Sequence, residues 1–188
     1  MLINNTLLEK AIIFATKAHA GVCRKGDGRA YILHPLSVMS RVTELKKDEV
    51  SAEELLYLQI VAVLHDVVED EQLDGENVTI EIIEAEFGAR VARGVAQLSL
   101  DKENYKTIGK KEYLVIEMNK MDDDIYDIKL CDRLDNIHDM DSMDEKDPSF
   151  RPYYIEQTWY VLSKQVRDFE LSHLRAIDKI KEKLNSYN

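Results

Sequence analysis

The chain has 188 residues, and its 36 Asp and Glu against 25 Lys and Arg give a formal net charge of −11. This balance argues against a general nucleic-acid binder, which needs a net-basic face to displace counterions from phosphate. It also disfavours adsorption to an anionic membrane surface. A small polyanionic substrate remains compatible with it, provided that a metal or a local basic cluster receives the phosphates.

The length fits one domain, residues 1–188, long enough to bury about 70% of its unfolded surface. Only 7 Gly and 3 Pro are present, which is few for an all-β sandwich with frequent turns. No apolar run approaches the roughly 20 residues of a bilayer-spanning helix, and the first residues do not resemble a signal peptide. Cys23 and Cys131 lie far apart without a CxxC spacing, which predicts free thiols and a cytoplasmic protein.

Helical periodicity dominates the first fifty residues. Thr6 and Glu9 have the spacing of a capping box, which predicts a first helix that stops at Gly21. Pro35 suits the first position of a second helix, because that position needs no backbone N–H donor.

The next helix is predicted to be the centre of the core. Ser51 and Glu54 form another capping-box pattern before the run 55–68, which is apolar nearly all round. Thr79 is predicted to cap a short helix that ends near Gly88. Further helices are expected over residues 89–98, 110–121, 123–140 and about 153–184.

The main non-helical stretch is predicted between Arg24 and Leu33, where Gly26-Asp27-Gly28 is a tight-turn signal. The fold class that follows is all-α: a single-domain helical bundle with one loop that carries functional residues.

The segment LHDVVED places four titratable side chains, His65, Asp66, Glu69 and Asp70, at the end of the most apolar helix. Burying an unpaired charge costs several kcal/mol, so the group needs an explanation. A spacing of four puts His65 with Glu69, and Asp66 with Asp70, on shared helix faces. Such stripes suit a metal with a carboxylate pair beside it. The alternative is a solvated helix end whose acids face water.

The loop sequence RKGDGRAYILHP carries two adjacent cations, Arg24 and Lys25, and a histidine, His34, directly before Pro35. Arg and Lys on a glycine-bearing loop can wrap phosphate oxygens, the first as a fork and the second as a point charge. The alternatives are an exposed basic turn and a histidine that caps or packs.

The segment KLCDRLDN places Asp132 between Leu130 and Leu134 on a helix with an apolar stripe. An acid in this position is paired, metal-bound or just off the buried face. Arg133 offers the simpler explanation, because it can neutralise a neighbouring carboxylate.

Together the three segments supply His34, His65, Asp66 and Asp132. Mixed imidazole and carboxylate ligation suits a divalent transition metal such as Mn²⁺, Fe²⁺ or Zn²⁺. The set contains no thiolate, which disfavours a structural zinc site.

The order H…HD…D resembles that of the HD-domain metal-dependent phosphohydrolases. The fuller set, FATKAHAG-x-x-RK, YILHP, LHDVVED, FG-x-x-V and KLCDRLDN, is similar to the hydrolase domain of RelA/SpoT-type alarmone enzymes, especially the single-domain hydrolases related to metazoan SpoT homologues. The resemblance covers about residues 7–140, with a helical extension over about 150–187. It implies an all-helical bundle, in agreement with the periodicity.

The resemblance also implies roles for individual residues. One Mn²⁺ is held by His34, His65, Asp66 and Asp132. The carboxylates that manage protons and activate a water are Glu69 and Asp70. Substrate binding falls to Arg24, Lys25, Lys102 and Asn136.

The implied activity is removal of the 3′-diphosphate from (p)ppGpp, which gives GDP or GTP and pyrophosphate. Three departures from the family pattern leave the exact substrate open: Glu71 follows the ED pair, and His138 and Asp139 follow Asn136. An alternative is therefore the hydrolysis of another phosphorylated nucleotide, such as NADPH. A third hypothesis is a metal- and nucleotide-binding module without turnover.

The aromatic residues of the last predicted helix leave the oligomeric state open. Trp159 and the Tyr153–Tyr154 pair could pack the core, line a base pocket or face a second subunit in a homodimer. The expected partner in every case is a small phosphorylated nucleotide, rather than a long nucleic acid or a membrane.

Overall fold

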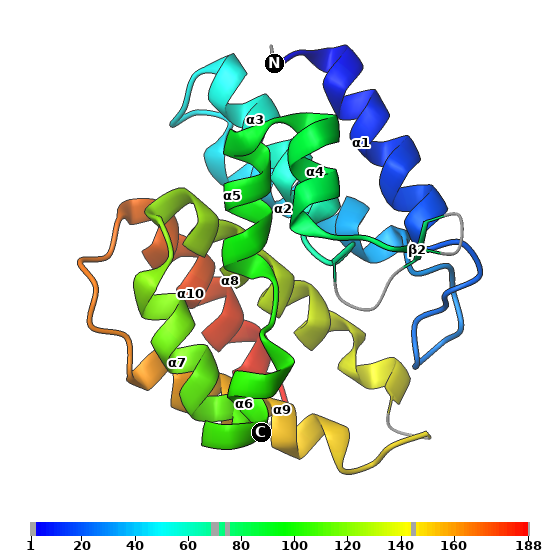
Figure 1. Cartoon of the computed structure of the whole chain (residues 1–188). Helices are drawn as coiled ribbons and strands as arrows, with labels where there is room; N and C mark the ends of the chain where they lie inside the picture. The colour runs from blue at the N-terminus through cyan, green and yellow to red at the C-terminus, as the bar shows by residue number, and fades with distance from the viewer. Residues whose placement is uncertain (1–2, 69–71, 74–75, 144–145, 188) are drawn as a thin grey trace. The chain divides into compact units, whose positions relative to one another are not determined.

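The computed structural model describes residues 3–68, 72–73, 76–143 and 146–187. Within these ranges the regular structure is helical apart from one two-stranded antiparallel hairpin, so the all-α prediction is confirmed (Figure 1). The chain forms two compact units. The first contains Met1–Cys23 and Arg29–Ser99, and the second contains Arg24–Gly28 and Leu100–Asn188.

The first unit is built around one buried helix. Its elements are α1 (Asn5–Ala18), α2 (Leu33–Lys46), α3 (Ala52–Leu64), β1 (Gln72–Leu73), β2 (Glu76–Asn77), α4 (Ile80–Phe87) and α5 (Ala89–Leu98). Helix α3 packs against α1, α2 and α5, and its residues from Ile60 to Leu64 are fully buried. The apolar run after Ser51 therefore lies in the core, as its composition predicts.

Helix starts in the first unit agree only in part with the sequence patterns. The prediction that Thr6 and Glu9 form a capping box is wrong. Helix α1 begins at Asn5, and the Asn4 side chain accepts a hydrogen bond from the Leu7 N–H (2.9 Å). Asparagine caps a helix as well as serine or threonine does, and here it stands two residues before Thr6. The prediction that Pro35 is the first residue of the second helix is also wrong, because α2 begins at Leu33.

The caps of α3 and α4 follow the sequence more closely. The Ser51 hydroxyl accepts a hydrogen bond from the Glu54 N–H (3.2 Å), and Thr79 caps α4 through the Ile82 N–H (3.4 Å). Gly88 separates α4 from α5 with φ of 89°, a conformation that favours glycine. Figure 1 shows the two helices side by side as a result.

Helix α3 ends at Leu64, four residues before the predicted end. His65 is the C-cap residue, and the Val67 N–H bonds to the Leu64 carbonyl (3.2 Å) in a tighter turn. The expectation that the helix continues to Val68 is therefore wrong. Glu69 and Asp70, the second members of the predicted pairs, lie outside the described residues.

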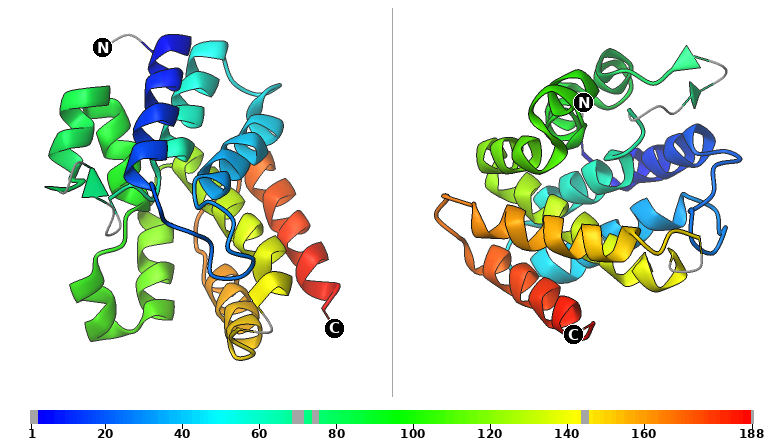
Figure 2. Two further views of the ribbon diagram at one scale, coloured as in Figure 1. Left: turned by 90° about the vertical axis from the view of Figure 1, so that its right-hand side faces the viewer. Right: turned by 90° about the horizontal axis from the view of Figure 1, so that it is seen from below.

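The second unit is organised by α8. Its elements are α6 (Lys102–Ile108), α7 (Lys110–Lys120), α8 (Asp123–Asp139), the short 3₁₀ helix η1 (Met140–Met143), α9 (Phe150–Ser163) and α10 (Leu171–Asn185). Helix α8 contacts α9, α10 and η1, and every residue from Ile125 to Asp135 is buried. The views of Figure 2 show α8 and the red α10 running side by side.

The predicted single helix over residues 153–184 is wrong, because the chain breaks between α9 and α10. Arg167 lies in this break and donates hydrogen bonds to the carbonyls of Met118 (3.0 Å) and Met121 (2.9 Å). Asn119 binds the same segment by accepting from the Val166 N–H (2.8 Å). These contacts with the end of α7 replace the helical hydrogen bonds that the segment gives up.

The N-terminus of α10 is fixed to α8 by buried polar groups. Ser172 donates to the Asp127 carboxylate (2.8 Å), while the His173 ring accepts from the Glu170 N–H (3.0 Å) and meets the Asp123 carbonyl through Nε2 (3.0 Å). Asp127, Glu170 and His173 lie close enough to hold a metal ion. Because Nδ1 of His173 caps α10 and Nε2 meets a carbonyl at the start of α8, we assign this group a structural role.

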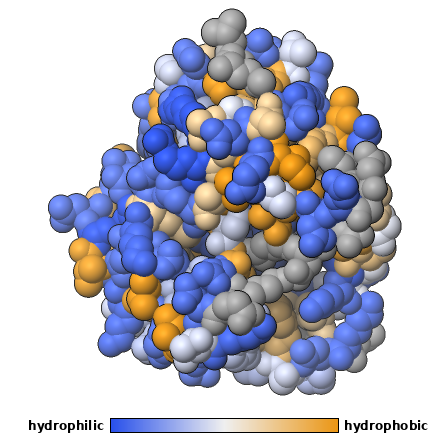
Figure 3. Space-filling view, viewed as in Figure 1, coloured by the Kyte–Doolittle hydropathy of each residue, from blue (hydrophilic) through white to orange (hydrophobic). Residues whose placement is uncertain are grey.

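The face of the molecule in Figure 3 is mainly hydrophilic, with hydrophobic side chains in separate patches. Among the described residues, no helix combines the length and the hydrophobicity needed to cross a membrane. Cys23 is exposed and Cys131 is buried, and both are free thiols, as predicted.

Candidate active site

His34, His65 and Asp66 form a compact group in the first unit, which we call the His–Asp cluster. His65 Nε2 lies 3.1 Å from one carboxylate oxygen of Asp66, and His34 Nε2 lies 3.5 Å from the other. One ligand atom from each of the three residues can be chosen so that all lie within 4.8 Å of one another. The fold therefore brings together three of the four ligands that the sequence predicts.

The cluster exists because α2 packs against α3. His34 is the second residue of α2, and His65 directly follows α3, so the packed helices bring together side chains that are 31 residues apart. The two imidazole rings lie 5.2 Å apart at their centroids, and both histidines are buried. His65 Nδ1 lies 2.8 Å from the Ala62 carbonyl, which favours a proton on Nδ1 and directs Nε2 towards Asp66.

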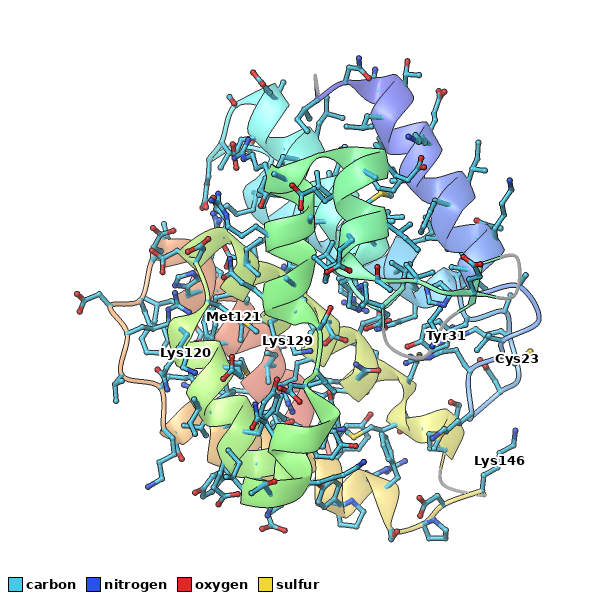
Figure 4. The ribbon with its side chains drawn as sticks, in the orientation of Figure 1. Cys23, Tyr31, Lys120, Met121, Lys129 and Lys146 are labelled. Atoms are coloured by element: carbon cyan, nitrogen blue, oxygen red, sulfur yellow. The ribbon has the colours of Figure 1, made fainter. Side chains whose placement is uncertain are left out.

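Tyr31 supports the cluster, a role that its sequence context alone does not predict. Its hydroxyl donates a hydrogen bond to Asp66 Oδ2 (2.7 Å), and its ring meets the His34 ring edge-on. Figure 4 shows Tyr31 on the segment that connects α1 to α2, three residues before His34. The available signal was its place at the start of the YILHP motif.

We expect Tyr31→Phe to weaken divalent-metal binding by about 10- to 100-fold, because outer hydrogen bonds orient ligating carboxylates. Calorimetric titration of the metal-free protein with Mn²⁺ measures this loss. Tyr160→Phe is the matched control, since it removes a hydroxyl that bonds to Glu112 (3.2 Å) in the second unit. Equal Mn²⁺ affinity in Tyr31→Phe and the native protein would contradict the supporting role.

His19 is a buried residue that packs beside the cluster. Its ring packs on Tyr31 with 4.8 Å between the centroids. Burial is the main cause that lowers the pKa of His19 from 6.5 to about 4, while the Asp66 carboxylate opposes this change.

This buried histidine predicts an acid-sensitive fold. Between pH 6.5 and about 4 the unfolded chain binds a proton at His19 that the folded chain does not. Stability that is present above pH 6.5 is therefore lost as the pH falls, by up to roughly 3 kcal/mol at His19. Urea unfolding of the metal-free protein at several pH values should show a shallower loss for His19→Gln. Identical pH slopes would contradict this prediction.

The donor set of the His–Asp cluster fits a divalent transition metal. Two imidazole nitrogens and one carboxylate converge. Imidazole suits Zn²⁺, Fe²⁺ and related ions, whereas carboxylate suits Mn²⁺. The Tyr31 hydroxyl and the Ala62 carbonyl orient the carboxylate and one imidazole. A divalent metal held by these residues would supply two kinds of chemistry, the polarisation of an oxygen ligand and the activation of water.

Asp132 belongs to the second unit, where it lies in a chain of hydrogen bonds along α8. Its carboxylate accepts from Lys129 Nζ (2.9 Å) and from Asn136 Nδ2 (2.6 Å). The spacings of three and four residues place all three side chains on one face of the helix. Asn136 Oδ1 in turn accepts from Arg24 Nη2 (2.9 Å). We call these residues, together with Asp139, the α8 network.

Arg24 reaches α8 from the loop Arg24–Gly28. The Gly28 N–H bonds to the Arg24 carbonyl (3.1 Å), and Gly28 has φ of 77°, so the predicted tight turn is confirmed. Lys25 is exposed on the same turn. A Cβ at Gly26 would lie 1.9 Å from the Ser142 hydroxyl oxygen, so glycine allows the loop to lie against η1.

The remaining predicted residues have less structural description. Glu69 and Asp70 lie outside the described residues, as does Glu71. Lys102 is the first residue of α6, and its side chain lies outside the description.

Two further side chains in the α8 network were missed as functional residues. Lys129 precedes Asp132 by three residues, a helical spacing that predicts an ion pair. Asp139 departs from the family pattern, but nothing local in the sequence connects it to Arg24.

The helical fold and the buried His–Asp cluster of the first unit define the class of protein to which the chain can belong. The HD domain family profile matches residues 11–163 of the chain. The chain belongs to the HD domain family, which confirms the family assignment made from its motifs.

Curated relatives of the RelA/SpoT type support this assignment. The chain is 32% identical over 149 residues to a GTP pyrophosphokinase of Myxococcus xanthus, with 74% of this chain covered. It is 33% identical over 132 residues to the guanosine-3′,5′-bis(diphosphate) 3′-pyrophosphohydrolase of Aquifex aeolicus and 34% identical over 138 residues to that of Haemophilus influenzae, with 69% and 70% covered. The matched region is 17–18% of the length of these relatives.

A solved structure agrees with the fold over nearly the whole chain. It is described as a metazoan ortholog of SpoT that hydrolyzes ppGpp and plays a role in starvation responses, and it matches with a TM-score of 0.75. The identity is 20%, and the match covers 97% of this chain and 98% of that one. This similarity establishes the HD-type fold.

Proposed function

We propose that the chain is a metal-dependent pyrophosphohydrolase that removes the 3′-diphosphate from (p)ppGpp and releases pyrophosphate with GDP or GTP. The observation that carries this proposal is the His–Asp cluster, whose three ligand groups converge as a divalent metal requires. The two related 3′-pyrophosphohydrolases support the choice of substrate.

The proposed metal is Mn²⁺, held by the His–Asp cluster with Asp132 as the fourth ligand. The chemistry that a divalent metal held there would supply is polarisation of a phosphoryl oxygen and activation of water. The chain's own residues prepare this position. Tyr31 orients the Asp66 carboxylate, and the Ala62 carbonyl directs the His65 ring.

Glu69 and Asp70 are the proposed proton carriers. One carboxylate takes a proton from the attacking water, whose oxygen bonds to the phosphorus attached to the ribose O3′. The O3′–P bond breaks, pyrophosphate leaves, and the ribose oxygen receives the proton that the carboxylate took from water. Transfer by positioned carboxylates typically contributes 10²- to 10⁴-fold to the rate.

Phosphate recognition is assigned to Arg24 and Lys25, with Lys102 as a further cation and Asn136 as a nucleotide contact. Cations are needed here because the net charge of the chain is −11. We extend the proposal to a single HD domain over residues 1–188 that acts on a small nucleotide in the cytoplasm. The free thiols of Cys23 and Cys131 are consistent with that location.

The direct test is incubation of the purified protein with ppGpp and Mn²⁺, followed by measurement of pyrophosphate and GDP. Equimolar release of both products is expected. Bound metal without pyrophosphate release would exclude the alarmone assignment.

A second candidate is the hydrolysis of another phosphorylated nucleotide by the same residues. The observation that favours it is Asp139, which binds Arg24 and so changes the charge offered to phosphate. An assay of NADPH and nucleoside phosphates beside ppGpp distinguishes the two candidates. Hydrolysis of one of these nucleotides without hydrolysis of ppGpp would support the second candidate.

A binding module without turnover is the third candidate, from a different class. It predicts nucleotide binding in calorimetry with no product from any of these nucleotides. The presence of the two predicted proton-carrying carboxylates in addition to the four predicted metal ligands supports turnover instead.

A further inference from the structure

Asp139 is the last residue of α8, a position where the helix dipole disfavours a negative charge. Its carboxylate is nevertheless partly buried and fixed. Oδ2 accepts hydrogen bonds from Arg24 Nε (2.9 Å) and from Arg24 Nη2 (2.5 Å). The two side chains are only 13% and 17% exposed, so the guanidinium lies against Asp139 and largely away from solvent.

Further contacts hold the loop in the same place. Asn136 Oδ1 accepts from Arg24 Nη2 (2.9 Å), and the Ser142 hydroxyl donates to the backbone carbonyl of Asp139 (2.7 Å). The Cα of Gly26 approaches Ser142 so closely that any side chain would collide with it. The pair is therefore part of an ordered corner formed by the loop, the end of α8 and η1.

The charges in this corner decide how much attraction a phosphate meets. Arg24 and Asp139 together carry no net charge, and a phosphate oxygen must compete with a carboxylate for the same guanidinium. Lys25, the next residue, is exposed and carries its charge on a flexible stem.

We propose that Asp139 is a specificity-determining residue that limits the phosphate affinity of the loop by neutralising Arg24, so that Lys25 supplies the loop's effective positive charge. The inference rests on the proposed function for the identity of the substrate. Its chemistry concerns any polyphosphate bound at this loop.

The test compares Asp139→Asn with Asp141→Asn. Asparagine can still accept a hydrogen bond from Arg24, so the loop stays docked while the competing charge is removed. Asp141 is a matched control in η1: it pairs with Arg151 (2.9 Å) and Lys183 (3.7 Å), and its loss changes the net charge equally. Calorimetric titration with inorganic pyrophosphate and steady-state kinetics with ppGpp are measured for both variants.

We expect Asp139→Asn to lower KM and the Kd for pyrophosphate by about tenfold, with kcat changed less than about twofold. Asp141→Asn should leave both constants near their native values. The double variant Arg24→Gln/Asp139→Asn removes a neutral pair and should bind pyrophosphate within about threefold of the native protein, whereas Lys25→Gln should weaken binding about tenfold. The double variant also decides the matter if Asp139→Asn alone does not fold.

Unchanged or weaker binding in Asp139→Asn would overturn the inference and leave the pair as a tether for the loop. An equal gain in Asp141→Asn would overturn it as well, because the effect would then come from net charge. Lack of ppGpp hydrolysis by the native protein would refute only the proposed function, because the pyrophosphate titration would still measure the effect of Asp139 on phosphate affinity. Lack of pyrophosphate binding in every variant would overturn the inference itself.

Discussion

Replacing Asp66 with alanine is expected to abolish tight metal binding and to lower ppGpp hydrolysis by at least about 10³-fold. Asp66 is the residue that both histidines of the cluster face, at 3.1 Å and 3.5 Å from its two oxygens. Its loss removes the anionic ligand and the acceptor of the Tyr31 hydroxyl together. Metal content by mass spectrometry and pyrophosphate release measure the two effects separately.

The matched control is Asp48→Ala, which removes an exposed acid of the first unit in the turn after α2. This variant should keep its metal and its activity. A full metal content in Asp66→Ala would show that the His–Asp cluster is not the metal site. Persistent hydrolysis would separate turnover from the cluster altogether.

The second large effect is expected from Glu69→Gln and Asp70→Asn. Each amide keeps the size of the side chain but cannot take a proton from water. We therefore expect kcat to fall by about 10²- to 10⁴-fold while the metal content stays near that of the native protein. Single-turnover kinetics with ppGpp measure the chemical step, and mass spectrometry measures the metal.

The combination of these two readouts separates the roles. Loss of metal in Glu69→Gln or Asp70→Asn would make the residue a ligand instead of a proton carrier. Native kcat with native metal content would remove the residue from the mechanism. Glu71→Gln is the control, because it changes the same charge in the neighbouring position.

The composition of the cluster could be predicted from the sequence, because His65 and Asp66 end an apolar run where titratable groups need a partner. Its geometry could not be derived in the same way. A shared helix face requires α3 to continue through Val68, whereas α3 ends at Leu64 and a turn carries His65 and Asp66. Adjacent residues at a helix end present their side chains to a neighbouring helix without the four-residue spacing.

The long C-terminal helix shows a different limit. Residues 164–170 contain no Gly or Pro, so nothing local predicts the break between α9 and α10. The break is stabilised by Arg167, which binds backbone carbonyls at the end of α7 more than forty residues earlier in the chain. Tertiary contacts here override a helical pattern, and such contacts cannot be predicted from the neighbouring residues in the sequence.

For the loop Arg24–Gly28, the turn could be predicted from the sequence, whereas the ion-pair partner of Arg24 could not. Gly26-Asp27-Gly28 predicts the turn from local conformational preferences alone. The partner of Arg24 is separated from it by 115 residues, and only the fold connects them. The sequence therefore identifies Arg24 as a cation of the loop but does not predict that Asp139 neutralises it.

The division of the chain into units has a consequence for dissecting the protein. The backbone passes from one unit to the other at 23–24, 28–29 and 99–100, because the loop Arg24–Gly28 is grouped with the C-terminal half. A truncation after Ser99 would retain the loop but discard α8, and Arg24 would lose both Asn136 and Asp139. No single cut therefore yields two intact halves, and complementation of fragments would have to restore a five-residue insertion as well as the helices.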